Sequence, residues 1–227
     1  MQIDLISFDL DHTLIEFDKL LSVALKGVAA FLTEETGRVF TPASLQAIRD
    51  RFATRPEAQG MKLLALREAS MAAELGPDHA GLAAKAIALF NEARLTNVPL
   101  IEGAREVLDE LSAHLPLAVL SNGNSDPHRV GIATYFRHVF LEDNLPHPKP
   151  DPRAFTALAE AAGTQPERII HVGDSFADDV TGAQSAGAIP VWFNPAGTPA
   201  PSDAAPLHDL RKLTDLPALI RGLQAQG

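Results

Sequence analysis

The chain has 227 residues, 46% of them hydrophobic, so it is long enough to bury a sizeable core in one or two domains. Its formal net charge is -10 and no cluster of lysine and arginine stands out, which excludes a nucleic-acid polymer as the expected partner. The absence of cysteine excludes disulfides, thiolate metal sites and thiol nucleophiles, so any chemistry must come from oxygen and nitrogen groups.

The start of the chain bears on its location in the cell. Met1 leads almost directly into the apolar run 3–8, with neither a basic leader nor a small-residue cleavage site. No stretch of the sequence is long and apolar enough for a membrane span. We therefore expect a cytoplasmic protein without a membrane partner.

Short apolar runs that are typical of strands alternate with amphipathic stretches that are typical of helices. The first run, residues 3–9, is rich in strand formers and ends in acidic and polar residues. Nearly continuous apolar strands suit a parallel sheet buried on both faces, so the sequence predicts a doubly wound α/β domain. The later predicted strands are residues 117–120, 139–141, 169–172 and 190–193, and the clearest helical stretches are 102–113 and 152–162.

Residues 17–98 follow a different pattern, with no strand-like run. Apolar residues in the segment 21–32 recur at helical spacing. Thr41-Pro42 and Gly76-Pro77 have the composition of helix boundaries, so we predict a bundle of about four helices. The helices would form a second domain, residues 17–98, inserted into a first domain made of residues 1–16 and 99–227.

The last part of the chain differs again in composition. Residues 194–206 are rich in alanine and proline, which is typical of a loop. An apolar stretch at about residues 216–223 follows, and we predict a short closing helix there.

Polar residues follow the predicted strands at the points where the strands end. The first strand ends in Asp9-Leu10-Asp11-His12-Thr13, and later strands are followed by Ser121-Asn122-Gly123 and Gly173-Asp174-Ser175. Lys149 lies in a loop after another strand. Because ligands of doubly wound sheets bind outside the carboxyl ends of the strands, we expect these groups to form one site.

The expected site has the groups that phosphoryl transfer needs, because the transferred group spreads negative charge over its equatorial oxygens. A carboxylate nucleophile alone would repel such a substrate. A magnesium ion (Mg2+) held by Asp9, Asp174 and a backbone carbonyl near Asp11 would cancel that repulsion. Lys149 would add a second positive charge, and the Ser121 hydroxyl with neighbouring amides would hold another phosphoryl oxygen.

Asp11 is a second carboxylate, two residues after Asp9. It could protonate the leaving oxygen and then deprotonate the water that cleaves the acyl phosphate. The sequence therefore favours one carboxylate that attacks phosphorus and another that moves protons.

Four segments resemble the four motifs of the haloacid dehalogenase-like (HAD) hydrolase superfamily, in order and suitably spaced. The resemblance covers the whole chain. It implies a Rossmann-like core and, between the first and second motifs, a helical cap of the first type (C1). The segments are Asp9-Leu10-Asp11-His12-Thr13-Leu14, Ser121-Asn122-Gly123, Lys149-Pro150-Asp151-Pro152 and Gly173-Asp174-Ser175-Phe176-Ala177-Asp178-Asp179.

The same resemblance implies roles for individual residues. Asp9 would be the nucleophile, Asp11 the general acid/base and Asp174 a magnesium ligand. Lys149 would also stabilise charge on the phosphoryl group. The implied phosphate-binding residues are Ser121, Asn122, Gly123 and Lys149.

Other polar residues allow two interpretations. Asp178 and Asp179 could each support the metal, or be favourable first-turn acids of the following helix. His12 stands where the family often has Gly or Asp; it could contact substrate or be structural. We expect His171, within a predicted strand, to be a hydrogen-bonded core histidine. A set of basic residues in the insertion could reach a substrate or form a solvated face: Arg51, Arg55, Lys62 and Arg67.

The expected function is that of a magnesium-dependent phosphatase acting on a small phosphorylated metabolite. Residues 173–195, especially Val191-Trp192-Phe193-Asn194-Pro195, are similar to nucleoside monophosphate phosphatases of the superfamily. A nucleotide, a sugar phosphate and a phosphoglycolate-like acid all remain open as substrates. The sequence does not indicate an oligomeric state.

Three other functions remain as alternatives. A haloacid dehalogenase is not expected to need the second aspartate, so Asp11 with Thr13 favours phosphate esters. A phosphomutase would return the phosphoryl group to a bound sugar. A non-catalytic phospho-acceptor module, like a response-regulator receiver, would accept one phosphoryl group without repeated turnover, but the long helical insertion argues against it.

Overall fold

The computed structural model describes residues 2–79, 81–201 and 208–225. The chain divides into two compact units. One, called here the core unit, consists of Met1–Glu16 and Pro99–Gly227, and the other, the helical unit, is Phe17–Val98. Their roles as catalytic core and cap stay predictions.

The core unit contains a six-stranded sheet, in which every pair of neighbouring strands is parallel. The spatial order is β3-β2-β1-β4-β5-β6. This order confirms the predicted doubly wound α/β fold. The strands are β1 (Leu5–Phe8), β2 (Leu117–Leu120), β3 (Phe136–Phe140), β4 (Ile169–Gly173), β5 (Ile189–Phe193) and β6 (Asp209–Leu210).

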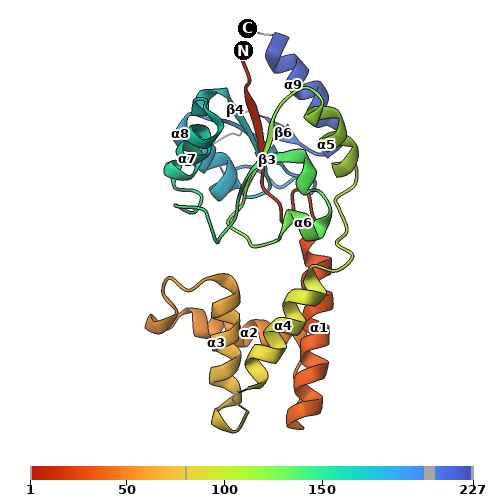
Figure 1. Ribbon diagram of the computed structural model, residues 1–227, viewed down its shortest axis with the longest axis vertical. Helices are drawn as coiled ribbons and strands as arrows, with labels where there is room; N and C mark the ends of the chain where they lie inside the picture. The colour runs from red at the N-terminus through yellow and green to blue at the C-terminus, as the bar shows by residue number, and fades with distance from the viewer. Residues whose placement is uncertain (1, 80, 202–207, 226–227) are drawn as a thin grey trace. The chain divides into compact units, whose positions relative to one another are not determined.

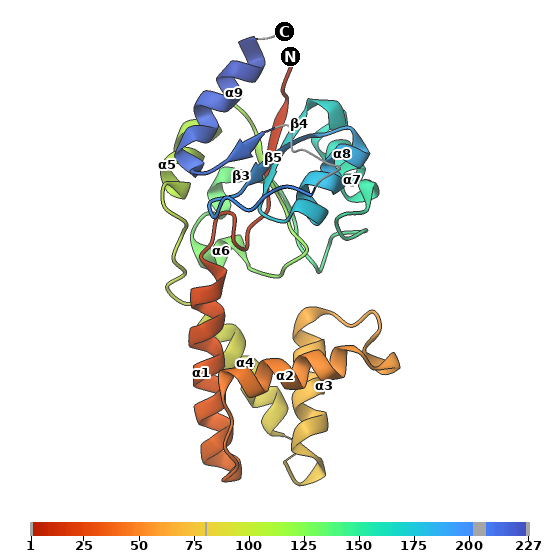
Figure 2. The ribbon, with the colours of Figure 1, turned by 180° about the vertical axis from the view of Figure 1, so that it is seen from behind.

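Helices cover both faces of this sheet (Figures 1 and 2). α5 (Ala104–Ser112) and α9 (Leu216–Ala225) lie on one face, and α7 (Pro152–Ala162) and α8 (Gly182–Ala186) lie on the other. Phe155 and Leu158 of α7 are fully buried in a cluster with Leu5 and Leu120 of the sheet. Both faces of the sheet are therefore buried, which is why its inner strands are mostly apolar, with Ser7 and His171 as the polar exceptions.

The central strand β1 lies where the chain reverses its direction across the sheet. From β1 the chain adds β2 and β3 on one side, then crosses to β4 on the other side of β1. Phe8 pairs with Val172, and the Asp9 amide donates to the Val172 carbonyl at 2.9 Å. The carboxyl ends of β1 and β4 thus lie side by side at the switch point, where doubly wound sheets bind ligands.

The helical unit contains the predicted four helices and packs them around one apolar cluster. α1 packs along α4 and α2 packs against α3. Thr41 caps α2 reciprocally: its hydroxyl accepts from the Ser44 amide at 3.0 Å, and the Ser44 hydroxyl accepts from the Thr41 amide at 2.9 Å. The helices are α1 (Phe17–Thr36), α2 (Pro42–Ala53), α3 (Leu63–Leu75) and α4 (Leu82–Arg94).

The longest of these helices, α1, has 20 residues and carries charged side chains such as Lys26 and Glu34. Among the described residues, no helix is both long and apolar enough to cross a membrane. The cytoplasmic location stays a prediction.

Two elements begin at residues that differ clearly from the sequence-based expectation. β3 begins at Phe136 rather than at residue 139, because this half-exposed strand includes polar residues in its first half. α5 begins at Ala104 rather than at residue 102, because Gly103 is left-handed with φ 79°. The predicted loop 194–206 lies partly outside the described residues, whereas the predicted closing helix is confirmed as α9.

The position of Arg67 differs from the solvated basic face that the sequence analysis allowed for the insertion. Arg51, Arg55 and Lys62 are exposed, but Arg67 on α3 is only 6% exposed, so a solvated face is wrong for this residue. Its guanidinium lies over the Phe90 ring, 4.5 Å from the centroid, and its Nη1 atom has no hydrogen-bond partner. Burial, together with nearby Arg49, lowers the pKa of Arg67 to about 10.

Replacing Arg67 by methionine should stabilise the helical unit, because a thioether fills similar space without the cost of burying a charged group whose Nη1 atom has no hydrogen-bond partner. We expect the free energy of unfolding of Arg67→Met to rise by about 1 kcal/mol. Urea unfolding followed by circular dichroism would measure it. Arg51→Met, at an exposed site, should change stability by less than about 0.5 kcal/mol. A destabilised Arg67→Met would contradict this account.

Candidate active site

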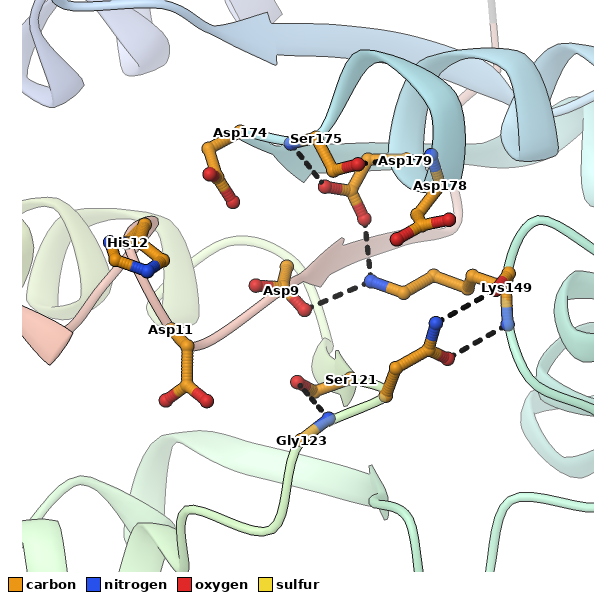
Figure 3. A pocket seen from close by; sticks show the side chains of 11 residues that line it. Asp9, Asp11, His12, Ser121, Gly123, Lys149, Asp174, Ser175, Asp178 and Asp179 are labelled. Carbon is orange, nitrogen blue, oxygen red and sulfur yellow. Dashed lines mark hydrogen bonds and ion pairs between the residues drawn. The ribbon is translucent and has the colours of Figure 1, made fainter. Parts of the chain in front are cut away.

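A pocket of about 220 Å³ lies at the carboxyl edge of the sheet in the core unit (Figure 3). It is lined by every residue that the sequence analysis assigned to the expected site, with His12 and Ser175 beside them. The structure therefore brings four separated stretches of chain together; the roles of the residues stay predictions. The predicted residues are Asp9, Asp11, Ser121, Asn122, Gly123, Lys149, Asp174, Asp178 and Asp179.

A buried ion pair lies at the inner end of this pocket. The Lys149 ammonium donates to Asp9 Oδ1 at 2.9 Å and to Asp179 Oδ1 at 2.5 Å. Burial raises the pKa of Asp9 to about 7, although Lys149 opposes this shift. Burial alone would lower the pKa of Lys149, but the two carboxylates hold that pKa above its usual value. The lysine is therefore a fixed cation next to the predicted nucleophile.

The two tandem aspartates have different environments. They lie in a short π-helical segment, η5 (Phe176–Thr181), that follows β4. The Ser175 amide donates to Asp179 Oδ2 at 2.9 Å, and the Ser175 hydroxyl accepts from the Asp178 amide at 3.1 Å. Asp179 is thereby buried against Lys149, while Asp178 is half-buried. A Cβ atom at Gly173 would overlap the Asp179 carboxylate, so this close approach needs glycine.

Asn122 holds the backbone of Lys149. Its amide nitrogen donates to the Lys149 carbonyl at 2.7 Å, and its amide oxygen accepts from the Lys149 amide at 2.8 Å. Both polar atoms of this side chain are thus engaged with the loop that carries the lysine. Any contribution of Asn122 to phosphate binding would come through its backbone or through this support of Lys149.

His171 connects the buried ion pair to β1. Its Nε2 lies 3.0 Å from Asp179 Oδ1, and its Nδ1 lies 2.8 Å from the Ser7 hydroxyl. Burial lowers the pKa of His171, and a carboxylate can only accept, so the neutral ring donates from Nε2 and accepts at Nδ1. The predicted hydrogen-bonded core histidine is confirmed, and it also orients Asp179.

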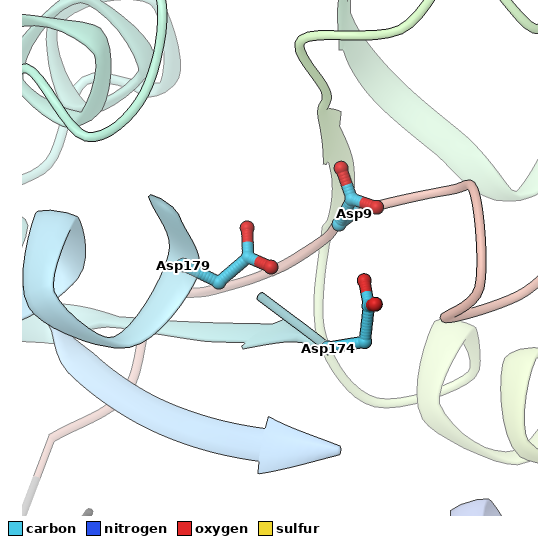
Figure 4. A group of neighbouring side chains, drawn as sticks. All are labelled: Asp9, Asp174 and Asp179. Atoms are coloured by element: carbon cyan, nitrogen blue, oxygen red, sulfur yellow. The ribbon is translucent and has the colours of Figure 1, made fainter. Parts of the chain in front are cut away.

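Three carboxylates could hold a cation. Asp9, Asp174 and Asp179 each have an oxygen within 4.8 Å of the other two (Figure 4). An all-oxygen donor set of this kind suits a hard cation such as magnesium, so the residues present fit the predicted metal. The group contains Asp174, which the sequence analysis predicted to be a metal ligand, and also Asp179; metal binding by these residues stays a prediction. The Asp11 carboxylate does not belong to this group of three carboxylates.

Side chains from two other segments of the core unit support Asp174. The Trp192 indole donates to the Asp174 carbonyl at 2.8 Å, and the Thr13 hydroxyl donates to Asp174 Oδ1 at 3.4 Å. Burial raises the pKa of Asp174 to about 6, and the neighbouring Asp179 charge adds to that shift. Nothing in the sequence indicated the Trp192 contact, because it depends on how β4 and β5 pair.

The Asp11 carboxylate is turned toward the loop that begins at Ser121. The Ser125 hydroxyl donates to Asp11 Oδ1 at 2.6 Å. Sequence reasoning did not single out Ser125, which lies four residues after Ser121 among other small polar residues. His12 itself is exposed and has φ 64°, a left-handed conformation in which glycine and aspartate are less strained than most residues.

Comparison with known proteins identifies the family. The model for haloacid dehalogenase-like hydrolases matches residues 3–187. The chain therefore belongs to the haloacid dehalogenase-like hydrolases, as its four motifs predicted.

Individual relatives give a more detailed comparison. N-acylneuraminate-9-phosphatase of Rattus norvegicus is 28% identical over 66% of this chain, which spans only 64% of the length of that relative. Phosphoglycolate phosphatase of Pseudomonas putida is 34% identical over 81% of this chain and 66% of its own. The crystal structure of 2-haloacid dehalogenase from Pseudomonas syringae superimposes with a TM-score of 0.85 and 28% identity, covering 98% of this chain and 100% of that one.

Replacing His171 by leucine should destabilise the core unit, because it removes the hydrogen bonds that the ring makes to the buried Ser7 hydroxyl and to the buried Asp179 carboxylate. We expect the free energy of unfolding of His171→Leu to fall by about 3 kcal/mol. Urea unfolding followed by the fluorescence of Trp192, the single tryptophan, would report on this unit.

The matched control is His114→Leu, which removes an exposed histidine of the same unit. Its stability should change by less than about 0.5 kcal/mol. Equal stability of the His171 and His114 variants would show that the buried hydrogen bonds do not support the ion pair.

Proposed function

We propose that this protein is a magnesium-dependent phosphatase that hydrolyses a small phosphate monoester through a phospho-aspartyl intermediate on Asp9. The observation that carries the proposal is the buried Asp9 carboxylate, at the end of the central strand, paired with Lys149 and next to Asp174 and Asp179. Two relatives named as phosphatases support it.

In the first step, an Asp9 carboxylate oxygen forms a bond to phosphorus as the bond to the leaving oxygen breaks. Lys149 neutralises charge beside Asp9, and the buried Ser121 hydroxyl is available to a phosphoryl oxygen. When bound, the metal supplies positive charge that polarises the phosphoryl oxygens. The outcome is an acyl phosphate on Asp9 and a free alcohol.

Asp11 moves the protons in both steps. It donates a proton to the leaving oxygen during the first step and becomes a carboxylate. That carboxylate then takes a proton from the water that attacks phosphorus, which releases inorganic phosphate and restores Asp9. The half-buried position of Asp11 at the pocket suits contact with both the leaving group and water.

Charge balance supports the need for a metal. Five aspartates line the pocket, whereas Lys149 is the single lysine or arginine in that lining. A doubly charged phosphate ester would therefore meet net repulsion from the chain alone. The carboxylates of Asp9, Asp174 and Asp179 supply the oxygen ligands that magnesium prefers.

A small substrate fits the pocket best. Its volume of about 220 Å³ suits a phosphoryl group with a compact leaving group. A nucleoside monophosphate, a sugar phosphate and a phosphoglycolate-like acid are the candidate substrates. Phosphate release from a panel of these esters, with and without magnesium, distinguishes them and tests the reaction class.

A haloacid dehalogenase is the second candidate, because the structure of 2-haloacid dehalogenase from Pseudomonas syringae superimposes over nearly the whole chain. A halide leaves without being protonated, so that reaction would not need Asp11 as a general acid. Chloride release from a 2-chloro acid without magnesium would favour this candidate over the phosphatase. Repeated release of phosphate to water would exclude a phosphomutase and a one-turnover phospho-acceptor.

Asp9→Asn should abolish the phosphatase activity, because a neutral amide oxygen is a poor nucleophile for phosphorus. We expect kcat for phosphate release from an aryl phosphate to fall by at least about 1,000-fold. Asp215→Asn removes an exposed carboxylate that does not line the pocket, and it should keep full activity. Full turnover by Asp9→Asn would sink the proposed mechanism.

Magnesium should bind more tightly as the pH rises. Burial raises the pKa of Asp9 to about 7 and that of Asp174 to about 6, so protons compete with the cation below neutral pH. From about pH 5 to about pH 8 the apparent affinity should increase at least about tenfold, then level off. Trp192 fluorescence would report binding, because its indole bonds to the Asp174 carbonyl. Affinity that is constant or falls with pH would contradict this prediction.

A further inference from the structure

The Asp11 carboxylate is held by a side chain that no motif of the sequence indicated. The Ser125 hydroxyl donates to Asp11 Oδ1 at 2.6 Å, a short hydrogen bond. Ser125 is 2% exposed, so solvent does not compete for its hydroxyl. The bond joins residues 114 positions apart in the chain and fixes one oxygen of Asp11.

The other oxygen of Asp11 lies close to the same loop. A Cβ atom at Gly123 would lie 2.6 Å from Asp11 Oδ2, closer than any real side chain could approach. Glycine at this position lets the carboxylate pack directly against the backbone of the loop. Both oxygens of Asp11 therefore lie against the loop that carries Gly123 and Ser125.

The loop that carries Ser125 is itself fixed. The Gly123 carbonyl accepts from the Glu142 amide at 2.9 Å, and the Asn124 side chain donates to Glu142 Oε2 at 3.0 Å. Asp126, the next residue after Ser125, caps α6 (Pro127–Val130) by accepting from the His128 amide at 2.9 Å. Ser125 thus lies between two anchored points, which makes its hydroxyl a rigid donor.

We propose that Ser125 is a positioning residue for proton transfer: its hydroxyl holds the Asp11 carboxylate in the orientation from which Asp11 protonates the leaving oxygen. This inference rests on the proposed function, in which Asp11 is the general acid. Without the hydroxyl the carboxylate loses this restraint on its orientation. A displacement of about 1 Å is enough to reduce the rate strongly.

The leaving group provides the test. An alkyl oxygen needs a proton to leave, whereas p-nitrophenolate leaves readily without one, so loss of acid positioning should affect alkyl esters most. For Ser125→Ala we expect kcat/KM to fall about 30-fold with an alkyl phosphate and less than about threefold with p-nitrophenyl phosphate. kcat/KM is chosen because it reports the first chemical step, where Asp11 acts as the acid.

Two variants control for the size and the chemistry of the change. Ser125→Thr keeps the hydroxyl and should restore most of the activity on the alkyl ester. Ser112→Ala removes an exposed hydroxyl on α5 and should leave both substrates unaffected. Should Ser125→Ala fail to fold, Ser125→Cys replaces the hydroxyl with a weak donor of similar size, and the same difference between the two substrates is expected.

The outcomes separate this inference from the proposed function. An equal loss with both substrates, or no loss, would overturn the positioning role of Ser125. If Asp11→Asn depresses the alkyl ester selectively and Ser125→Ala does not, only this inference fails. If the unmodified protein releases no phosphate, or Asp11→Asn affects both substrates equally, the proposed function fails and this inference fails with it.

Discussion

Lys149 places its ammonium group between the Asp9 and Asp179 carboxylates, at 2.9 and 2.5 Å, where almost no solvent reaches. Each of these charges would be costly to bury alone, so the three must be assembled together. Much of the surrounding structure serves this assembly. Asn122 fixes the lysine backbone, His171 orients Asp179, and glycine at position 173 leaves room for the Asp179 carboxylate.

The two carboxylates near the start of the chain have contrasting surroundings. Asp9 is buried and paired with a cation, whereas Asp11 is half-buried and bonded to the neutral hydroxyl of Ser125. Burial raises the pKa of Asp9, and the lysine opposes that shift. Different surroundings give two chemically identical side chains different properties, which is what a division between nucleophile and proton carrier requires.

Sequence patterns predicted the inner strands and the meeting of the site residues, because buried parallel strands are mostly apolar and their carboxyl ends share one edge. The outer strands were harder to predict. β3 includes polar residues, and β6 is only two residues long. The contacts of Ser125 and Trp192 depend on how distant segments pack, so no local pattern could indicate them. The choice between Asp178 and Asp179 depends on the π-helical segment that buries the second aspartate.

The discontinuous core unit has a consequence for biosynthesis. Ser7 on the central strand bonds to His171 on its neighbour, and 164 positions separate the two residues. β1 therefore leaves the ribosome long before β4 can pair with it, and its apolar side chains have no complete sheet to join until then. Such long-range pairing slows folding and leaves aggregation-prone intermediates. We therefore expect nascent chains that end before β4 to depend on chaperones.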